Sequence, residues 1–135
     1  MKPLAVLLCV ASLAWAGEFI TGQGDRLVIG QRTFTAQSPE SSDTVLGGVS
    51  GLAYANDILV VADSNRVGAS PENNRVLIFR NISGTLPAPA DELPQGERCP
   101  VCTGKADIVL GQPDFQKSDV GLSSSGLRQP TAAAT

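Results

Sequence analysis

One sequence pattern occurs twice in this chain of 135 residues, and it constrains the fold more than any other feature. Residues 27–34 read LVIGQRTF and residues 108–115 read IVLGQPDF, so the pattern returns after 81 residues, from position 27 to position 108. The segments that follow also correspond, since residues 51–54 fall about where residues 131–134 fall in the second copy. Self-similarity at a fixed spacing is typical of repeat proteins, in which one structural unit packs against the next.

Four short apolar segments lie in and between the two copies, and turn residues separate them. They are residues 52–54, 58–62, 75–79 and 106–110. Asn56 and Asp57 predict a tight turn after the first segment, because both residue types tolerate left-handed backbone. No helical period is present beyond the N-terminal segment. The sequence therefore predicts an all-β fold in which four consecutive antiparallel strands form one blade of a β-propeller.

Three of these stretches together resemble the NHL repeat family. They read GLAY at residues 51–54, LVVADS at residues 59–64 and NNRVLIF at residues 73–79. Residues 106–115 are similar to the linking element of exported bacterial NHL proteins. The resemblance implies that residues 17–135 hold about one full propeller blade and parts of its neighbours. It also implies a set of structural residues that recur in every unit: Asp63, Asn74, Arg75, Gly111, Gln112 and Asp114.

The chain departs from the family pattern in two ways. The loop between Asp63 and Asn74 is long, and residues 65–67 nearly duplicate the Asn-Arg-Val signal of residues 74–76. We assign Arg75 to the repeat because an apolar strand follows it. A Pro-rich insertion within residues 81–104 also lengthens the unit to about 80 residues, against about 40–45 for a comparable blade. Since residue 135 falls where the next blade would begin, we expect a fragment of a longer propeller; self-association of a short chain is the alternative.

The N-terminal segment has the three parts of a secretory signal peptide. Lys2 precedes an apolar run over residues 4–14, and Ala14 and Ala16 suit a cleavage site after Ala16. The run is shorter than the ~20 residues that span a membrane. The sequence therefore predicts a secreted or periplasmic protein with no membrane span in the mature chain.

Cys99 and Cys102 are the two cysteines of the predicted mature chain. A c-type haem site needs His after the second cysteine, where Thr103 stands. Zinc would need further ligands from elsewhere, and a thioredoxin-like redox centre would need a helix N-terminus. We expect a local disulfide, because exported proteins meet oxidising conditions; a labile redox pair is the alternative.

Composition narrows the chemistry further. The chain has no histidine, so it carries no His-based metal site and no Ser-His-Asp arrangement. The net charge is −3 without a block of like charge, which gives no reason to expect a nucleic-acid partner. Gly30-Gln31 and Gly111-Gln112 lack the spacing and the Lys of a phosphate loop and predict backbone turns. We therefore name no catalytic residue, cofactor or metal ligand.

Two functions remain from different classes. The first is a non-catalytic binding scaffold that presents its long loops, residues 64–72 and 81–104, on one face to a protein, glycan or cell-wall ligand. Asp63 and Arg75 would then form an ion pair or turn hydrogen bond at an exposed site, with a modest effect on stability. The second, which the resemblance permits, is part of a propeller enzyme such as a metal-dependent lyase or a lactonase-like hydrolase.

Overall fold

The computed structural model describes residue 21 and residues 27–64, 72–86 and 104–134. The expected signal peptide at residues 1–16 and the expected disulfide between Cys99 and Cys102 lie outside these residues. In the part of the chain that is described, no helix is long and apolar enough to cross a membrane.

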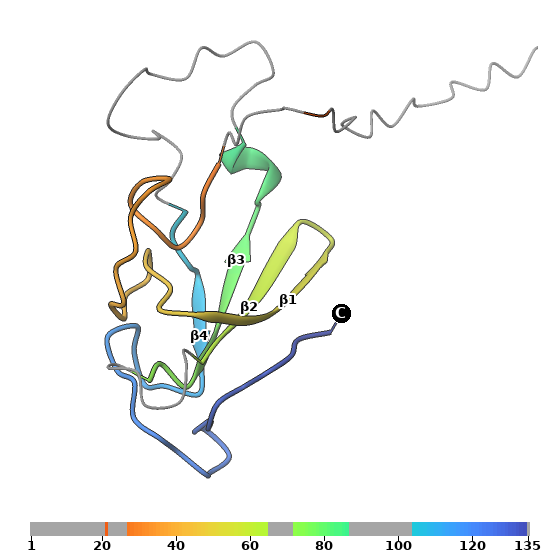
Figure 1. Cartoon of the computed structure of the whole chain (residues 1–135). Coiled ribbons are helices and arrows are strands. Elements are labelled where there is room, and N and C mark those ends of the chain that lie inside the picture. The colour runs from red at the N-terminus through yellow and green to blue at the C-terminus, as the bar shows by residue number, and fades with distance from the viewer. Residues whose placement is uncertain (1–20, 22–26, 65–71, 87–103, 135) are drawn as a thin grey trace, which may run out of the picture.

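Four strands form one antiparallel sheet in chain order (Figure 1). They are β1 (Val49–Ala55), β2 (Ile58–Asp63), β3 (Arg75–Arg80) and β4 (Ile108–Leu110). A short 3-10 turn, η1 (Ser83–Thr85), follows β3. The prediction of an all-β chain with four consecutive antiparallel strands is confirmed. The fourth strand begins at Ile108 rather than at residue 106, and the sheet is open rather than closed on itself.

The β1–β2 hairpin has the turn that the sequence predicts. Asn56 and Asp57 both have positive φ, 50° and 63°, and Ala55 pairs with Ile58 across the turn. Two successive residues with positive φ define the two-residue hairpin loop whose twist matches that of the flanking strands. This turn sets the register in which Tyr54 faces Leu59.

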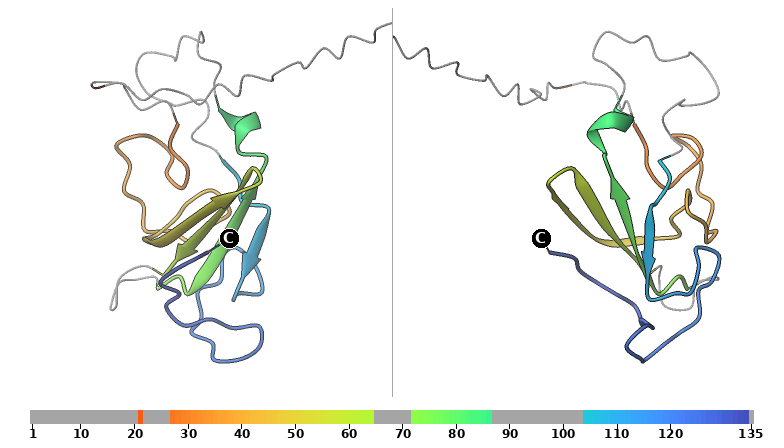
Figure 2. Two further views of the ribbon diagram at one scale, coloured as in Figure 1. Left: turned by 90° about the vertical axis from the view of Figure 1, so that its right-hand side faces the viewer. Right: turned by 180° about the vertical axis from the view of Figure 1, so that it is seen from behind.

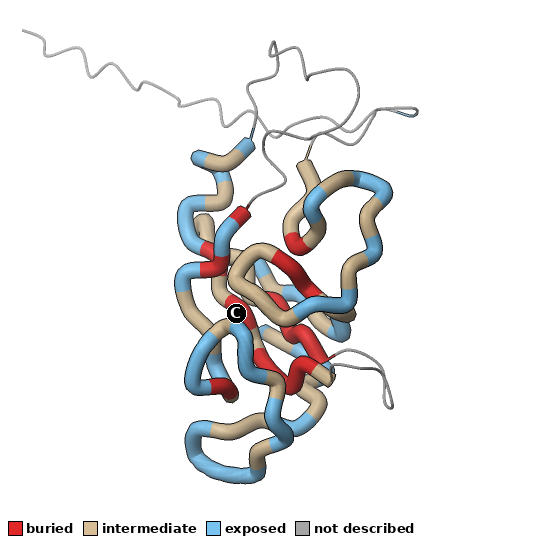
Figure 3. The backbone as a smooth tube through the Cα atoms, turned by 90° about the vertical axis from the view of Figure 1, so that its left-hand side faces the viewer, coloured by how far each residue is buried: buried red, intermediate tan, exposed pale blue. Residues whose placement is uncertain are grey.

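One face of the sheet, here called the core face, carries the hydrophobic core. Cross-strand partners share a face, and two sets of partners place β2 and β3 residues on it: Leu59 with Phe79, and Val61 with Leu77. The buried cluster on this face consists of Leu46, Val61, Leu77, Phe79 and Ala106. Residues 27–48 run along this face and supply Ile29 and Leu46 to the packing. Figure 3 shows the buried positions concentrated along the sheet and the segment beside it.

The opposite face, here called the second face, is apolar except for Arg80, the cross-strand partner of Ile58. It carries Gly51, Ala53, Ala55, Ile58, Val60, Ala62, Val76, Ile78, Ile108 and Leu110. Strands that are apolar on both sides are typical of sheets with a layer on each face. Part of this face is covered: a Cβ built on Gly51 would lie 2.8 Å from the Ala132 Cα, so the C-terminal segment runs directly against β1 (Figure 2).

The residues that flank the two long loops lie at opposite ends of the sheet (Figures 1 and 2). In an antiparallel sheet of this order, the β1–β2 turn and the β3–β4 connection share one end, and the β2–β3 connection lies at the other. Ser64 and Glu72 therefore mark one end, and Asn81 and Gly104 mark the other. The expectation that the loops form one face concerns residues 65–71 and 87–103, which lie outside the described residues, so it stays a prediction.

Candidate functional site

The most elaborate polar site is a buried ion pair between Asp63 and Arg75 at one end of the sheet. The two residues are register partners at the end of β2 and the start of β3, and both side chains are 0% exposed. Arg75 Nε donates to Asp63 Oδ2 at 2.9 Å, and one terminal nitrogen lies 2.8 Å from the same oxygen in an ion pair. The remaining N–H groups donate to three backbone carbonyls, those of Ser42, Val45 and Phe115. All three guanidinium nitrogens thus donate hydrogen bonds.

Both carboxylate oxygens of Asp63 also accept hydrogen bonds. Its Oδ1 accepts the backbone N–H groups of Gly47 and Gly48 at 3.1 and 3.0 Å. Its Oδ2 accepts the Asn73 side-chain amide at 2.8 Å, besides the hydrogen bond from Arg75 Nε. No buried side-chain nitrogen or oxygen of the described residues lacks a partner. Because each nitrogen and oxygen of the pair already has a protein partner, the pair fastens residues 42–48 and Phe115 to the sheet.

The expectation of an exposed pair with a modest effect is therefore wrong. The strand ends are covered by the loop over residues 42–48, whose carbonyls and amides complete the coordination of both side chains. A buried pair of this kind is costly to break from one side, because the remaining charge stays in an environment of low dielectric constant. The sequence placed both residues in the repeat, but no local pattern identifies a covering loop from 15 to 33 positions earlier.

Asn74 and Gln112 join the sheet to the C-terminal segment. Asn74 has a φ of +46°, and its side chain donates to the Ser118 carbonyl and accepts the backbone N–H of Gln129. The Gln112 side-chain amide donates to the Asn74 carbonyl at 3.1 Å and to the Asp119 carbonyl at 2.7 Å. These bonds hold residues 112–129 against the start of β3.

The two copies of the sequence pattern adopt the same local structure. Gln31 donates to the carbonyl of Ser38 and accepts its backbone N–H, and Gln112 makes both bonds with Asp119, again seven residues later. Gly30 and Gly111 have φ of +92° and +86°, so the predicted backbone turns are present. At the position two residues after each Gln, a side-chain oxygen accepts the N–H three residues ahead: Thr33 for Ala36 and Asp114 for Lys117. The two copies are therefore similar in local structure as well as in sequence.

At the opposite end of the sheet, Asp57 connects the hairpin turn to η1. Its Oδ1 accepts the Ser83 backbone N–H and its Oδ2 accepts the Ser83 hydroxyl, both at 2.8 Å. The backbone hydrogen bond from Ser83, followed by the hydroxyl bond, lowers the pKa of Asp57 from its ordinary 3.8. Partial loss of hydration and the Asp57 carboxylate raise the pKa of Tyr54, whose hydroxyl donates to Asp57 at 3.3 Å. This arrangement is a turn cap on the surface.

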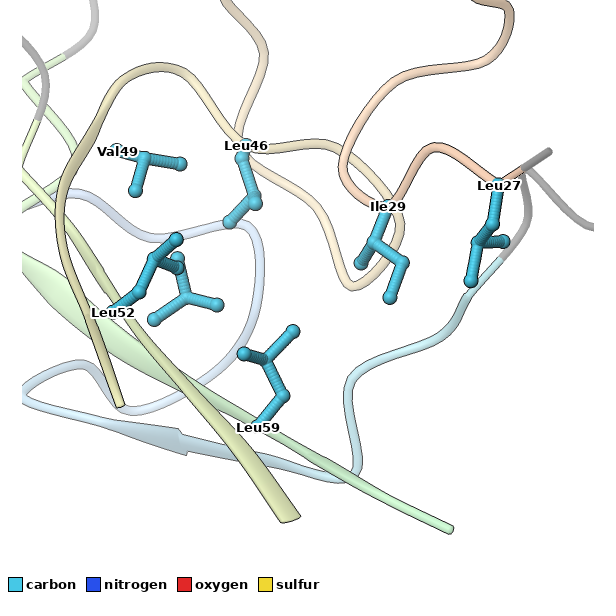
Figure 4. A pocket seen from close by; sticks show the side chains of 7 residues that line it. Leu27, Ile29, Leu46, Val49, Leu52 and Leu59 are labelled. Carbon is cyan, nitrogen blue, oxygen red and sulfur yellow. The ribbon is translucent and has the colours of Figure 1, made fainter. Parts of the chain in front are cut away.

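An apolar groove opens beside β1 on the core face, with a cavity volume of about 270 Å³. Figure 4 shows aliphatic side chains from the sheet facing others from the N-terminal segment. The lining residues are Leu27, Ile29, Leu46, Val49, Leu52, Leu59 and Val61. The groove continues into exposed apolar surface, since Leu52 is 61% and Tyr54 57% exposed. Sequence reasoning missed this feature, because its two walls come from segments with no common period.

The described residues hold no group of three or more His, Cys, Asp or Glu side chains that could bind a metal ion. Comparison with known proteins adds no identity, because no family model, curated protein or solved structure matches the chain. Among the described residues, the sites are thus two polar networks that fasten loops to the sheet, the Asp57 turn cap and an apolar groove.

Proposed function

We propose that this chain is part of an exported NHL-type β-propeller that acts as a binding scaffold, with its long loops as the contact surface. The ligand is a protein, a glycan or a cell-wall component. The observation that carries the proposal is the Asp57 turn cap, whose two hydrogen bonds from Ser83 fix the sheet end from which the long insertion departs. A rigid scaffold with loops at its ends is the usual arrangement of a binding module.

The repeat architecture has its own support. The sheet is apolar on both faces, and the Gly-Gln turn with its closing Gln occurs in two copies 81 residues apart. Units of this kind bury their exposed faces by stacking on neighbours. In a propeller, four-stranded sheets stack around an axis, and the loops at the sheet ends form the top and bottom surfaces.

The two loops are separate candidates, because their anchor points lie at opposite ends of the sheet. The insertion between Leu86 and Gly104 is the longer one, and it contains Asp91, Glu92 and Glu97 among several prolines. We assign the contact surface to this insertion. The loop between Ser64 and Glu72 then serves as the matched control at the other end.

The test uses two variants of the mature chain. One replaces residues 87–103 by a short Gly-Ser linker, and the other does the same for residues 65–71. Binding is measured by co-sedimentation with insoluble peptidoglycan and on an immobilised glycan array, and protein ligands are sought by cross-linking on intact cells. We expect the first variant to lose binding and the second to retain it, with both showing the wild-type circular dichroism spectrum.

Retention of full binding by the first variant would contradict the assignment of the contact surface. Absence of binding by the wild-type chain to all three kinds of probe would contradict the scaffold function itself. The Ser64–Glu72 control separates a specific loss from a general effect of shortening a loop.

A further inference from the structure

The sheet has two edge strands, β1 and β4, and they differ in length and in protection (Figure 1). β4 has three residues, with Asp107 directly before it and Pro113 shortly after it. β1 has seven residues, VSGLAYA, with no charge and no proline. Proteins usually protect a sheet edge with short strands, charges, prolines or bulges. β1 has only a register irregularity between Val49 and Gly51, so residues 51–55 form an unprotected edge.

The hairpin geometry decides which backbone groups of this edge are free. Ala55 and Ile58 flank the two-residue turn and therefore form a hydrogen-bonded pair. Hydrogen-bonded and non-hydrogen-bonded pairs alternate along an antiparallel ladder, so the backbone N–H and C=O groups of Leu52 and Tyr54 point away from β2. Neither residue makes a backbone hydrogen bond elsewhere in the described part of the chain.

The side chains of the same two residues are accessible. Leu52 is 61% and Tyr54 57% exposed, and both lie on the core face, opposite Val61 and Leu59. Ala53 lies between them on the second face, and its small side chain leaves room for a neighbouring strand. Cross-strand pairs with an aromatic member are among those that stabilise a sheet. The edge thus offers two free backbone donors, two free acceptors and two apolar side chains.

We propose that the β1 edges of two copies of this chain pair antiparallel around a two-fold axis, with Ala53 of one copy opposite Ala53 of the other. Leu52 of each copy then lies opposite Tyr54 of the other, and the two pairs form four backbone hydrogen bonds. Both copies use the same surface, as a closed dimer requires. Because residues 51–55 carry no charge, no like charges meet at the axis. The two sheets join into one continuous sheet.

Other registers with the same free groups are poorer. An axis centred on Leu52 would place Tyr54 opposite Ser50, where the strand is irregular. An axis centred on Tyr54 would place Leu52 opposite Asn56, a turn residue with positive φ. The dimer goes beyond the proposed ligand-binding role and does not rest on it, because only β1 of each copy takes part.

The first measurement is the mass of the mature chain in solution, by sedimentation equilibrium under reducing conditions, which exclude intermolecular disulfides. We expect twice the mass of a single chain for the wild type. For L52K/Y54K we expect the mass of a single chain, because each Lys faces another Lys across the axis. A wild-type chain with the single mass, or a dimeric L52K/Y54K, would overturn the proposal.

The matched control is V120K/L122K, which adds the same charge at two apolar residues outside the strands. These side chains are 57% and 83% exposed, so the substitutions do not disturb the core. We expect this variant to remain dimeric with the wild-type circular dichroism spectrum. Dissociation of the control would show that added charge, rather than the β1 edge, decides the association.

The register is tested by mixing L52K/Y54K with L52E/Y54E. Each variant alone places like charges opposite each other, whereas a mixed dimer places Lys opposite Glu at both pairs. We expect each to be monomeric alone and the equimolar mixture to form heterodimers. A mixture that stays monomeric would contradict the pairing of Leu52 with Tyr54.

A further measurement uses the wild-type chain without any substitution. Amide hydrogen exchange is followed at increasing protein concentration. We expect the Leu52 and Tyr54 amides to become protected as the dimer forms, and the Ala53 amide, which faces Val60 of β2, to be protected at every concentration. Fast exchange of the Leu52 and Tyr54 amides at all concentrations, or protection that dilution does not remove, would overturn the dimer.

Discussion

Gln31 and Gln112, which lie 81 residues apart, close equivalent loops. Each side chain bonds to the residue seven positions ahead. Each side chain accepts a backbone N–H and donates back to the carbonyl of the same residue, Ser38 in one loop and Asp119 in the other. Each also donates to a second carbonyl, of Leu46 or of Asn74. These second carbonyls belong to different parts of the fold. Leu46 lies in the segment that packs on the core face, and Asn74 lies directly before β3.

We expect Q31A and Q112A each to lower the free energy of unfolding by about 1–3 kcal/mol, because backbone groups lose their partners in half-buried positions. The measurement is urea unfolding followed by circular dichroism. Since Gln112 is the more buried and bonds directly to the residue before β3, we expect Q112A to be the more destabilising. Wild-type stability in both variants would show that the loops close without their glutamines.

The substitution R75A removes the cation from the buried pair and leaves the Asp63 carboxylate without its counter-charge. We expect a loss of about 3–5 kcal/mol, a large part of the stability of a small domain. R75K keeps the charge but not the planar fork that reaches three carbonyls, so we expect it to recover only part of this loss.

The matched control for Arg75 is R32A. Arg32 forms an ion pair with Glu40 at 2.9 Å, but these side chains are 68% and 53% exposed. Exposed pairs contribute at most about 1 kcal/mol, so we expect R32A to leave thermal unfolding nearly unchanged. Equal effects of R75A and R32A would refute the importance of burial.

Alanine at Gly30 or Gly111 tests the positive-φ turns. Both substitutions place a Cβ where L-residues are strained, at a cost of about 1–3 kcal/mol. A Cβ on Gly30 would also lie 2.4 Å from the Leu46 side chain, which is only 6% exposed and cannot move away. The equivalent contact of Gly111 is with Leu127, a half-buried residue outside the core cluster. We therefore expect G30A to lower the melting temperature more than G111A, and the reverse order would contradict the placement of Leu46.

The Asp57 cap predicts a pH dependence. The pKa of Asp57 is lowered in the folded chain, so its stabilising effect is present above 3.8 and is lost as the pH falls through the lower, folded value. The isosteric variant D57N lacks this titration but keeps a residue that tolerates positive φ. Between about pH 6 and about pH 2, we expect the difference in melting temperature between wild type and D57N to shrink. A difference that stays constant over this range would exclude a role for the charge.

Local patterns predicted the sheet well. The β-branched run at residues 58–62 and the two turn residues Asn56 and Asp57 define a hairpin without help from distant parts of the chain, and the structure contains it. The choice of Arg75 over Arg66 as the strand residue also agrees with β3, which begins at Arg75. The NHL family and the propeller remain predictions, because they concern units beyond this sheet.

The surroundings of the sheet could not be predicted in the same way. The burial of Asp63 depends on Gly47 and Gly48, which donate to it only after the chain has folded back over the strand ends. The apolar groove likewise combines Leu27 with Leu52 and Val61, from two segments with no common period. Such contacts are set by tertiary packing, which leaves no periodic signal in a single sequence.

The contact between Ser50 and Pro130 has a consequence for the order of folding. The Ser50 hydroxyl donates to the Pro130 carbonyl at 2.5 Å across 80 positions of sequence, whereas the β1–β2 hairpin closes over a two-residue turn. Bringing distant positions together costs chain entropy before any contact compensates for it, so the hairpin forms early and this closure comes late. We expect the second face to remain open for most of the folding reaction. A newly made chain would pass through that stage with an apolar sheet face exposed, so a faster final closure would reduce its loss to aggregation.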